Sequence, residues 1–330
     1  RRRRRNRRRA DREASVRAIL YRALDQPVRS TQLVDTLAPA DQKLLEAKAR
    51  TLLAGLRGED RETLARVLEN RGAVESARRR CRSRRAGARA GACRLLGDAG
   101  SPFAVLDLVP LLNDRKPDVR CTAARALGRL GQSTAVAPLM ASLGRRHPPP
   151  VDVVADAVEA IRDCPIEVVR RGLDDPSVPA RSVAVELLGR LQVLDAVDDL
   201  IGVVGHDPKL EVRVRAVRAL GRLGSPPVVE TLVGCLLGGP PEMRTEAVRA
   251  LGRLGSPEAV PALLMLLLGD SFGLSVAAAE ALAAISPLGV TVLEGVAVDE
   301  NHPAAPRARR ALVARCSAPA AHQSAPLSGG

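Results

Sequence analysis

Aromatic side chains are almost missing from this sequence: its 330 residues include Tyr21, Phe103 and Phe272, and no tryptophan. A single globular core of this length ordinarily uses large rings to fill its centre. Apolar residues still make up 46% of the chain, and most of them are Ala, Leu and Val. Because small side chains let neighbouring helix backbones approach closely, the composition predicts thin helical layers rather than one thick core.

Residue patterns typical of enzymes and metal sites are missing as well. The six cysteines form no C-x-x-C pair, and the common hydrolase, metalloprotease and nucleotide-binding motifs do not occur. The four histidines, His147, His206, His302 and His322, fall in predicted loops or in the tail. We therefore expect no catalytic residue, no metal, no cofactor and no small-molecule substrate.

A run of apolar residues long enough to cross a membrane is also absent. The longest, Ala259 to Leu268, is about half of the ~20 residues that a spanning helix needs. Positive charge is concentrated instead: residues 1–9 hold eight Arg and residues 78–89 hold seven Arg, with no acid in either tract. These two tracts account for the net charge of +14, so the rest of the chain is close to neutral. This distribution disfavours nucleic-acid binding along the whole chain.

An internal repeat of about 31 residues dominates the sequence. The string Ala-Leu-Gly-Arg-Leu-Gly occurs at residues 126–131, 219–224 and 250–255. Repeats of this kind stack, because one unit cannot bury its apolar face alone. The first Leu of the string marks a column that returns every 30 to 32 residues: Leu96, Leu127, Val158, Leu188, Leu220, Leu251, Leu282 and Leu312.

Each repeat contains two predicted helices with separate start and stop signals. Ser-Pro pairs such as 225–226 and 256–257 predict the start of the first helix, with Ser as the cap and Pro in the first position. Gly131, Gly224 and Gly255 predict the end of the second helix, where a left-handed residue is favoured. The pattern therefore predicts an all-α solenoid of about eight helical hairpins.

The second helix of each repeat shows which residues face the core. In residues 212–223 the apolar side chains share one wide arc. Arg213 lies at the edge of that arc, where a charged side chain needs a partner. An Asp stands six residues before this Arg in three repeats. The spacing predicts a structural ladder of Asp–Arg contacts, within or between adjacent repeats, formed by Asp114, Arg120, Asp175, Arg181, Asp207 and Arg213.

Further arginines recur on the exposed side of the second helices. We interpret this column as the best candidate for a partner-binding face. The alternative is a solvated face without a partner, since Glu186 and Glu246 are mixed into it. The candidate residues are Arg125, Arg129, Arg190, Arg215, Arg218, Arg222, Arg249 and Arg253.

The repeat resembles the HEAT repeat, in the short bacterial form related to the phycobilin-lyase type. The resemblance covers about residues 86–316, and it is specific for fold rather than for function. It implies a right-handed superhelix whose second helices line the concave face, and an Asp–Arg ladder is a known feature of that family. The matching residues are Asp207-Pro208, Val212-Arg213, Ala216, Ala219-Leu220-Gly221, Gly224 and Ala259-Val260-Pro261.

The flanks of the array keep the period less well. We divide the chain into a basic flank (1–10), a helical capping region (11–80), the HEAT-repeat array (81–316) and a disordered tail (317–330). Residues 56–85 resemble bacterial HEAT-repeat proteins with an N-terminal membrane helix. We therefore expect residues 1–9 to be the cytoplasmic flank of a transmembrane helix that precedes this chain, close to an anionic membrane surface. A soluble cytoplasmic protein is the alternative.

Taken together, the patterns favour a non-enzymatic scaffold at the cytoplasmic face of a membrane that holds another protein along its concave surface. A bilin lyase or isomerase is a second hypothesis, which rests on the repeat resemblance alone. Such a site is expected to offer aromatic walls and convergent polar groups, which this sequence lacks. A nucleic-acid-binding protein that uses the two Arg tracts is a third hypothesis.

The assignment of helix faces predicts how two neighbouring substitutions differ. Ala216→Leu should destabilise the array by roughly 1–3 kcal/mol, because the longer side chain overpacks a close helix–helix contact. Arg218→Ala, on the exposed side, should change the free energy of unfolding by less than about 0.5 kcal/mol. Chemical denaturation of both variants measures the difference, and equal effects would mean that the faces are assigned wrongly.

Overall fold

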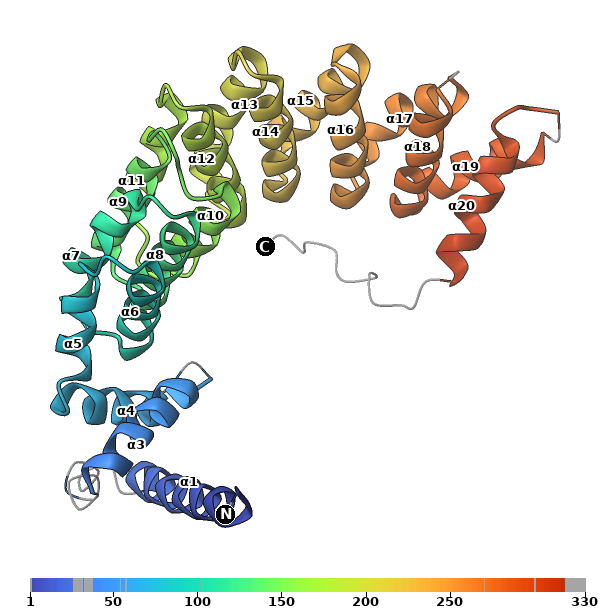
Figure 1. Cartoon of the computed structure of the whole chain (residues 1–330). Coiled ribbons are helices and arrows are strands. Elements are labelled where there is room, and N and C mark those ends of the chain that lie inside the picture. Colours follow the sequence, from blue (N-terminus) through green and yellow to red (C-terminus); the bar gives the residue numbers. More distant parts are fainter. Residues whose placement is uncertain are drawn as a thin grey trace, which may run out of the picture. The chain divides into compact units, whose positions relative to one another are not determined.

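The structure, a computed structural model, describes residues 2–317 except 26–31, 33–37, 54, 57, 102, 270 and 300. Within these residues the chain forms helices joined by turns and contains no strand. The all-α solenoid class is confirmed (Figure 1). The helices group into two compact units, which comprise residues 1–183 and 184–330. Most of the predicted tail, residues 318–330, lies outside the described residues.

The described part of the capping region contains three helices: α1 (Arg2–Asp25), α3 (Pro39–Leu53) and α4 (Gly58–Asn70). The last residues assigned to this region, 73–80, form part of the first hairpin instead. The three helices contact one another, and α4 also packs against the first helical hairpin. Arg61 on α4 donates hydrogen bonds of 3.0 Å to the main-chain oxygens of Gly97 and Asp98. The cap therefore satisfies carbonyl groups at the end of the first repeat. Residues 2–10, which the sequence set apart as a flank, are continuous with α1.

The first unit then forms three hairpins and most of a fourth, each with one short and one longer helix. The short first helices are often extended by a 3₁₀ segment (η), and the longer second helices carry the marker column. In chain order the elements are α5 (Ala73–Arg80), α6 (Ala86–Ala99), α7 (Ala104–Leu108), η2 (Val109–Asn113), α8 (Pro117–Leu130), η3 (Ser133–Ala135), α9 (Val136–Ser142), α10 (Val151–Glu159), α11 (Ile166–Arg171), η4 (Gly172–Asp174) and α12 (Val178–Arg190).

The second unit continues from within α12 with four more hairpins. Its second helices α14, α16 and α18 lie side by side (Figure 1). The described residues thus contain eight hairpins, as the period predicted. The elements are η5 (Leu194–Ala196), α13 (Val197–His206), α14 (Leu210–Leu223), α15 (Pro226–Gly238), α16 (Pro241–Leu254), η6 (Pro257–Ala259), α17 (Val260–Leu268), α18 (Phe272–Ala284), α19 (Leu288–Val298) and α20 (Ala305–Ser317).

The helix stop signals hold, but the serine caps do not. Gly131, Gly224 and Gly255 all follow second helices with φ between 60° and 69°, the left-handed conformation that glycine adopts without a Cβ penalty. Ser225 and Ser256 occupy the cap positions without making a side-chain cap hydrogen bond. The Ser225 hydroxyl is buried without a partner, so the prediction of a serine cap is wrong at both positions. Proline in the first turn favours the start of the helix there, because its fixed φ angle suits a helix.

Consecutive second helices meet at a glycine in one helix and an alanine in the next. A Cβ added to Gly221 would lie 3.1 Å from the Cα of Ala250, and one added to Gly128 would lie 2.7 Å from the Cα of Ala157. Real Cβ contacts are essentially never closer than about 3 Å, so the backbones approach as closely as their atoms allow. The same contact recurs within the units between Gly97 and Ala126, Gly189 and Ala219, and Gly252 and Ala281.

The ladder residues in the first unit connect neighbouring hairpins. The Asp114 carboxylate accepts hydrogen bonds of 2.6 and 2.8 Å from Arg89 of the preceding repeat. Arg120, only 8% exposed, donates to the main-chain oxygen of Asp114 at 2.9 Å. Although burial raises the pKa of Asp114, the hydrogen bonds from Arg89 hold it below the usual carboxyl value. In this repeat the carboxylate therefore pairs with the previous repeat, while the Arg six residues later binds the backbone.

The remaining ladder positions repeat parts of this arrangement. Arg181 donates to the main-chain oxygen of Asp175 at 2.9 Å, and the carboxylates of Asp175 and Asp207 each accept an N–H from two residues further on at 2.8 Å. Arg213 is half-buried, and its Nε has no hydrogen-bond partner. One repeat later, Arg244 donates to the main-chain oxygen of Leu236 at 3.0 Å. At Arg120, Arg181 and Arg244, the side chain in this register binds the main chain just before its own helix. Val151 takes the position in the third repeat.

The glycine–alanine contact makes a testable prediction about helix spacing. Gly221→Ala should destabilise the protein by roughly 1–3 kcal/mol, because the new methyl group overlaps Ala250 and the backbones must separate. Gly234→Ala is the matched control, since a Cβ at Gly234 on α15 meets nothing within 4 Å. That control should be neutral or stabilising by up to about 1 kcal/mol. Urea unfolding of both variants tests the contact, which would be refuted if the two substitutions stabilised alike.

Candidate protein-binding face

The arginine column lies on the exposed sides of the second helices, most densely on α14 and α16. These helices present Arg215, Arg218 and Arg222, and Arg249 and Arg253, respectively. Their opposite sides bury Ala216, Leu220, Ala247 and Leu251 completely. The alternation follows from the helical period of the apolar residues. We call the residues of this exposed side in the second unit the arginine face: Glu186, Arg190, Arg215, Arg218, Arg222, Glu246, Arg249 and Arg253.

Glu186 on α12 binds arginines of its own helix and of the next second helix. Its carboxylate lies 3.4 Å from Nη1 of Arg190 and 3.0 Å from Nη1 of Arg215. Arg215 also pairs with Glu211, one turn earlier on α14, at 3.2 Å. The guanidinium of Arg215 is therefore held between two carboxylates.

The strongest contact of the face joins α14 to α16. Arg218 binds Glu246 through two hydrogen bonds, with Nη2–Oε1 at 2.8 Å and Nε–Oε2 at 3.2 Å. Glu246 is only 8% exposed, and Arg249 approaches it at 3.3 Å from its own helix. The hydrogen bonds from Arg218 hold the pKa of Glu246 below its usual value. The two-pronged geometry is the one that favours Arg over Lys.

Both inter-helix pairs follow one register rule. The residue two before the marker in one helix pairs with the residue five before the marker in the next: Glu186 with Arg215, and Arg218 with Glu246. The sign of the charge is reversed between the two junctions. Each second helix is therefore complementary in charge to its own neighbour. If a helix packed against the wrong second helix, like charges would face each other at these two positions.

Three candidate arginines form no ion pair in the described part of the chain, although the charge of Arg253 contributes to the lowered pKa of Glu246. Arg125, Arg222 and Arg253 are all exposed and lie in no ion pair. Arg253 extends toward the preceding helix, since its Nη2 would be 3.2 Å from a Cβ at Gly221. Arg222 and Arg253 hold the same register in consecutive second helices, so each repeat of this pair presents one exposed guanidinium group at that position of the arginine face.

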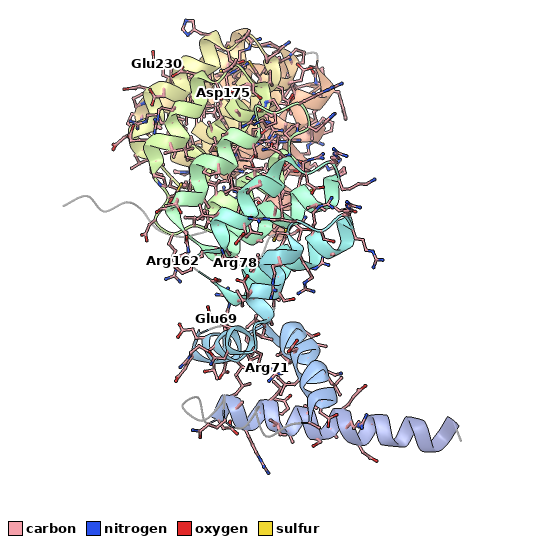
Figure 2. The ribbon with its side chains drawn as sticks, turned by 60° about the vertical axis from the view of Figure 1, so that its left-hand side comes forward. Glu69, Arg71, Arg78, Arg162, Asp175 and Glu230 are labelled. Carbon is pink, nitrogen blue, oxygen red and sulfur yellow. The ribbon has the colours of Figure 1, made fainter. Side chains whose placement is uncertain are left out.

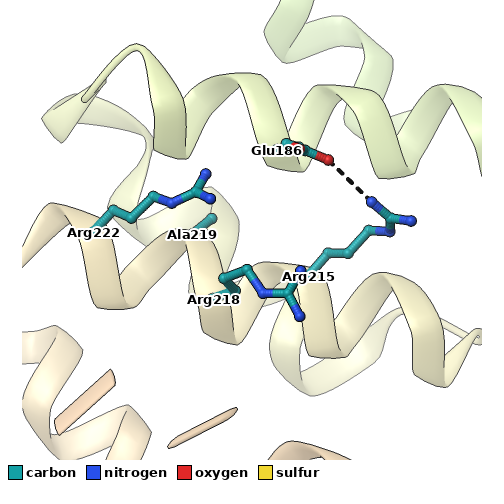
Figure 3. Close-up of a pocket in the computed structure, with 5 residues that line it drawn as sticks. All are labelled: Glu186, Arg215, Arg218, Ala219 and Arg222. Atoms are coloured by element: carbon teal, nitrogen blue, oxygen red, sulfur yellow. Dashed lines mark hydrogen bonds and ion pairs between the residues drawn. The ribbon is translucent and has the colours of Figure 1, made fainter. Parts of the chain in front are cut away.

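A shallow hollow lies beside these groups. Glu186, Arg215, Arg218, Ala219 and Arg222 line it (Figure 3), and its volume is about 10 Å³. That space holds about one water molecule, whereas sites for drug-sized ligands measure about 300–1,000 Å³. The hollow can therefore receive the end of one side chain rather than a cofactor.

In the first unit, the candidate residue Arg129 on α8 is paired. Its Nε lies 3.0 Å from the carboxylate of Asp98 on α6. Burial raises the pKa of Asp98, although Arg129 and Arg61 counteract it. Arg129 thus resembles the ladder residues in linking two repeats, and it is less available to a partner than Arg125 on the same helix.

The sequence did not reveal the pairing of Arg218. Glu246 suggested a solvated face, but the structure buries this carboxylate against Arg218. The expectation that Arg218→Ala is nearly neutral therefore no longer holds. Only the offset between stacked helices brings the two residues together, and they are 28 residues apart in the chain.

The described residues contain neither a metal-binding cluster nor a helix suited to cross a membrane. No group of His, Cys, Asp and Glu there is arranged to hold a metal ion. None of the described helices is both long enough and apolar enough to span a membrane.

Comparisons with known proteins agree with the repeat architecture. The family described as HEAT repeats matches residues 74–162 and 166–242. The PBS lyase HEAT-like repeat matches residues 243–269. No curated protein sequence matches the chain significantly.

Solved structures with similar folds include importin beta, which is 13% identical over 87% of this chain and 50% of its own, with a TM-score of 0.54. Kap95p, crystallised with RanGDP, is 12% identical over 87% of this chain and 47% of its own, with a TM-score of 0.53. The chain thus spans about half the length of these two proteins. The CpcE–CpcF complex of phycocyanin lyase from Nostoc sp. PCC7120 is 25% identical over 67% of this chain and 92% of its own, at a TM-score of 0.35. The first two show the fold alone.

The Arg218–Glu246 contact predicts a loss of stability that depends on pH. Arg218→Ala should cost about 1–2 kcal/mol at neutral pH, because it leaves a buried carboxylate with one weaker partner. Arg222→Ala, on the same helix and unpaired, should cost less than about 0.5 kcal/mol. Because the folded pKa of Glu246 is lowered, the effect of Arg218→Ala should be complete above the unfolded carboxyl pKa of about 4.3 and shrink as the pH falls below it.

Urea unfolding at several pH values measures this effect, and a double-mutant cycle with Glu246→Ala isolates the coupling between the two side chains. A cycle that returns no coupling energy at neutral pH would refute the contact.

Proposed function

The chain belongs to the HEAT-repeat family, and we propose that it serves as a non-enzymatic scaffold that binds another protein. The arginine face of the second unit is the proposed binding surface. It recognises an acidic segment of the partner, since guanidinium groups form two parallel hydrogen bonds with carboxylates. Kap95p, which has a similar fold, binds RanGDP, and this example supports protein binding as a use of such a solenoid.

The observation that carries the proposal is the free pair formed by Arg222 and Arg253. Both are exposed and form no ion pair, while their neighbours Arg215, Arg218 and Arg249 are held by carboxylates of the chain itself. Arg253 acts on Glu246 only at longer range, through its charge. Stacking of the repeats needs the paired arginines and does not need the free pair. A partner can engage Arg222 and Arg253 without breaking an existing ion pair.

The proposal that the protein is not an enzyme rests on the composition and on the hollow. The hollow on the arginine face is lined by three arginines, a glutamate and an alanine, and it holds about one water molecule. A bilin would require a much larger, apolar pocket. The match of residues 243–269 to the PBS lyase HEAT-like repeat is satisfied by helix packing alone, because this segment supplies α16 and α17.

The proposed location is the cytoplasmic face of a membrane. Its support is the tract of eight Arg in residues 1–9, since each Arg near an anionic leaflet contributes about 1 kcal/mol of attraction. The protein-binding proposal does not depend on this location.

A crosslinking pull-down followed by direct titration tests the protein-binding proposal. The tagged chain should capture a protein with an acidic segment, and the purified pair should bind in a salt-dependent manner. The double variant Arg222→Glu with Arg253→Glu should weaken binding by about tenfold or more, because each reversal opposes like charges across the interface.

Arg162→Glu with Lys209→Glu is the matched control, because both residues are exposed cations outside the arginine face (Arg162 in Figure 2). The control should bind as the wild type does. Equal losses in both double variants would show that net charge rather than the arginine face governs binding, and the proposal would be abandoned.

A further inference from the structure

A second cluster of free cations lies in the first unit, at the turns that join the two helices of each of its first three hairpins. Two columns in the repeat register form it: Arg84, Arg115 and Arg146 are 31 residues apart, and Arg85, Lys116 and His147 are 31 residues apart. Arg82 and Arg145 lie in the same turns. We call the cationic members of this group the basic edge: Arg82, Arg84, Arg85, Arg115, Lys116, Arg145 and Arg146.

All seven side chains of the basic edge are exposed, and none makes an ion pair within the described chain. Arginines just beside the edge behave differently. Arg78 (Figure 2) binds Asp107 at 2.6 Å, and Arg89 binds Asp114 at 2.6 Å. The acids of this region are therefore used by arginines that stabilise the stack, and they do not neutralise the edge.

The positive potential of the edge comes from its side chains. First helices end and second helices begin at these turns, so helix dipoles of opposite sign meet there and largely cancel. The exposed acids nearby are Asp118 and Asp152, in the first turns of α8 and α10. Seven cations against these two acids leave a clear excess of positive charge.

Turn formation does not require this charge. In the second unit, two of the corresponding turns contain Gly239 and Pro240 between α15 and α16, and Gly269 and Ser271 between α17 and α18. These two hairpins close without a single Arg or Lys in the turn, and the turn between α13 and α14 contains one cation, Lys209. The cations of the basic edge therefore serve something other than the hairpin.

The chemistry of the edge fits phosphate groups arranged on a broad surface. Six of its seven cations are Arg, which binds phosphate through two parallel hydrogen bonds. No aromatic side chain accompanies them in these turns, so the edge offers no stacking platform for the bases of a single strand. The helices run away from the turns, so no helix lies along the edge to enter a duplex groove.

We propose that the basic edge binds the surface of a membrane that contains anionic lipids. The cations recur at three successive turns of one unit, and a lipid bilayer presents phosphates without requiring a groove. This inference rests on the membrane location included in the proposed function, and it is independent of the arginine face. It adds a contact within the folded array to the one expected of residues 1–9.

Vesicle binding by the full chain tests the proposal. The probe is a vesicle of equal parts phosphatidylcholine and phosphatidylserine, with phosphatidylcholine alone as the uncharged comparison. The edge variant carries Arg84→Gln, Arg115→Gln and Arg146→Gln. The control carries Arg66→Gln, Arg162→Gln and Arg310→Gln, which removes the same number of exposed, unpaired arginines outside both the edge and the arginine face. Both sets of substitutions are also made in a chain whose eight arginines in residues 1–9 are replaced by Gln. In that chain, vesicle binding by residues 1–9 cannot mask a loss of affinity at the edge.

The edge variant should lose about a hundredfold in apparent affinity for the anionic vesicles, and the control should keep the affinity of its parent chain. Circular dichroism and the melting temperature should be unchanged in both, because all six side chains are exposed and unpaired.

Equal affinity of the edge variant and its parent overturns the proposal. If neutralising residues 1–9 then abolishes binding, the membrane location stands on that tract alone. If no chain binds the anionic vesicles, the membrane location falls together with the edge. Loss of duplex DNA binding in the edge variant, with vesicle binding retained, would assign the edge to nucleic acid instead.

Discussion

The contact between a glycine of one second helix and an alanine of the next sets the distance on which the other interactions of this protein depend. At Gly221 and Ala250 the backbones are so close that a single added methyl group has no room. Side chains at the margins of that contact then reach across without stretching, as Arg218 does toward Glu246. A wider spacing would leave Glu246 buried without its two-pronged partner, at a cost of about 1–3 kcal/mol for an unsatisfied buried group. The small-residue composition is therefore a condition for the ion pairs as well as for the core.

The sequence predicted what depends on neighbours along the chain and missed what depends on neighbours across the stack. The 31-residue period, the left-handed glycine at the helix ends and the buried Ala216 follow from local rules that each repeat obeys by itself. The ladder was predicted within or between repeats, and Asp114 pairs with Arg89 of the preceding repeat. The pairing of Arg218 with Glu246 was not predicted, because it depends on how far one helix is displaced along the next. No single-helix pattern contains that displacement. The serine caps failed for a different reason: proline already fixes the first turn at Ser225, so the hydroxyl is not required there.

The two units use the same fold for different distributions of free charge. In the first unit, most of the unpaired cations described above lie at the turns within hairpins, where the helices end, with Arg125 on a second helix as an exception. In the second unit, Arg222 and Arg253 lie on the exposed side of the second helices, and the turns before α16 and α18 contain no Arg or Lys. A stack held together by small residues and a few inter-repeat ion pairs leaves both surfaces open to substitution, because neither contributes to packing. The fold therefore allows one chain to present two separate basic surfaces, and the fold alone specifies a partner for neither.

In such a stack, an arginine that forms no ion pair indicates a binding surface better than an arginine that is already paired. A partner that bound Arg218 would first have to break its two charge-assisted hydrogen bonds to Glu246. Glu246 would then either become exposed or remain buried without its partner, and a buried, unpaired carboxylate strongly destabilises a protein. Capture of Arg222 requires only the removal of water and the ordering of one side chain, about 0.5–1.5 kcal/mol. The Asp–Arg ladder and the pairs of the arginine face thus mark the residues that hold the repeats together, and binding is expected where the chain supplies a charge and no counter-charge. By this argument the free pair on α14 and α16, and the edge at the first three hairpins, are the surfaces that we propose for binding.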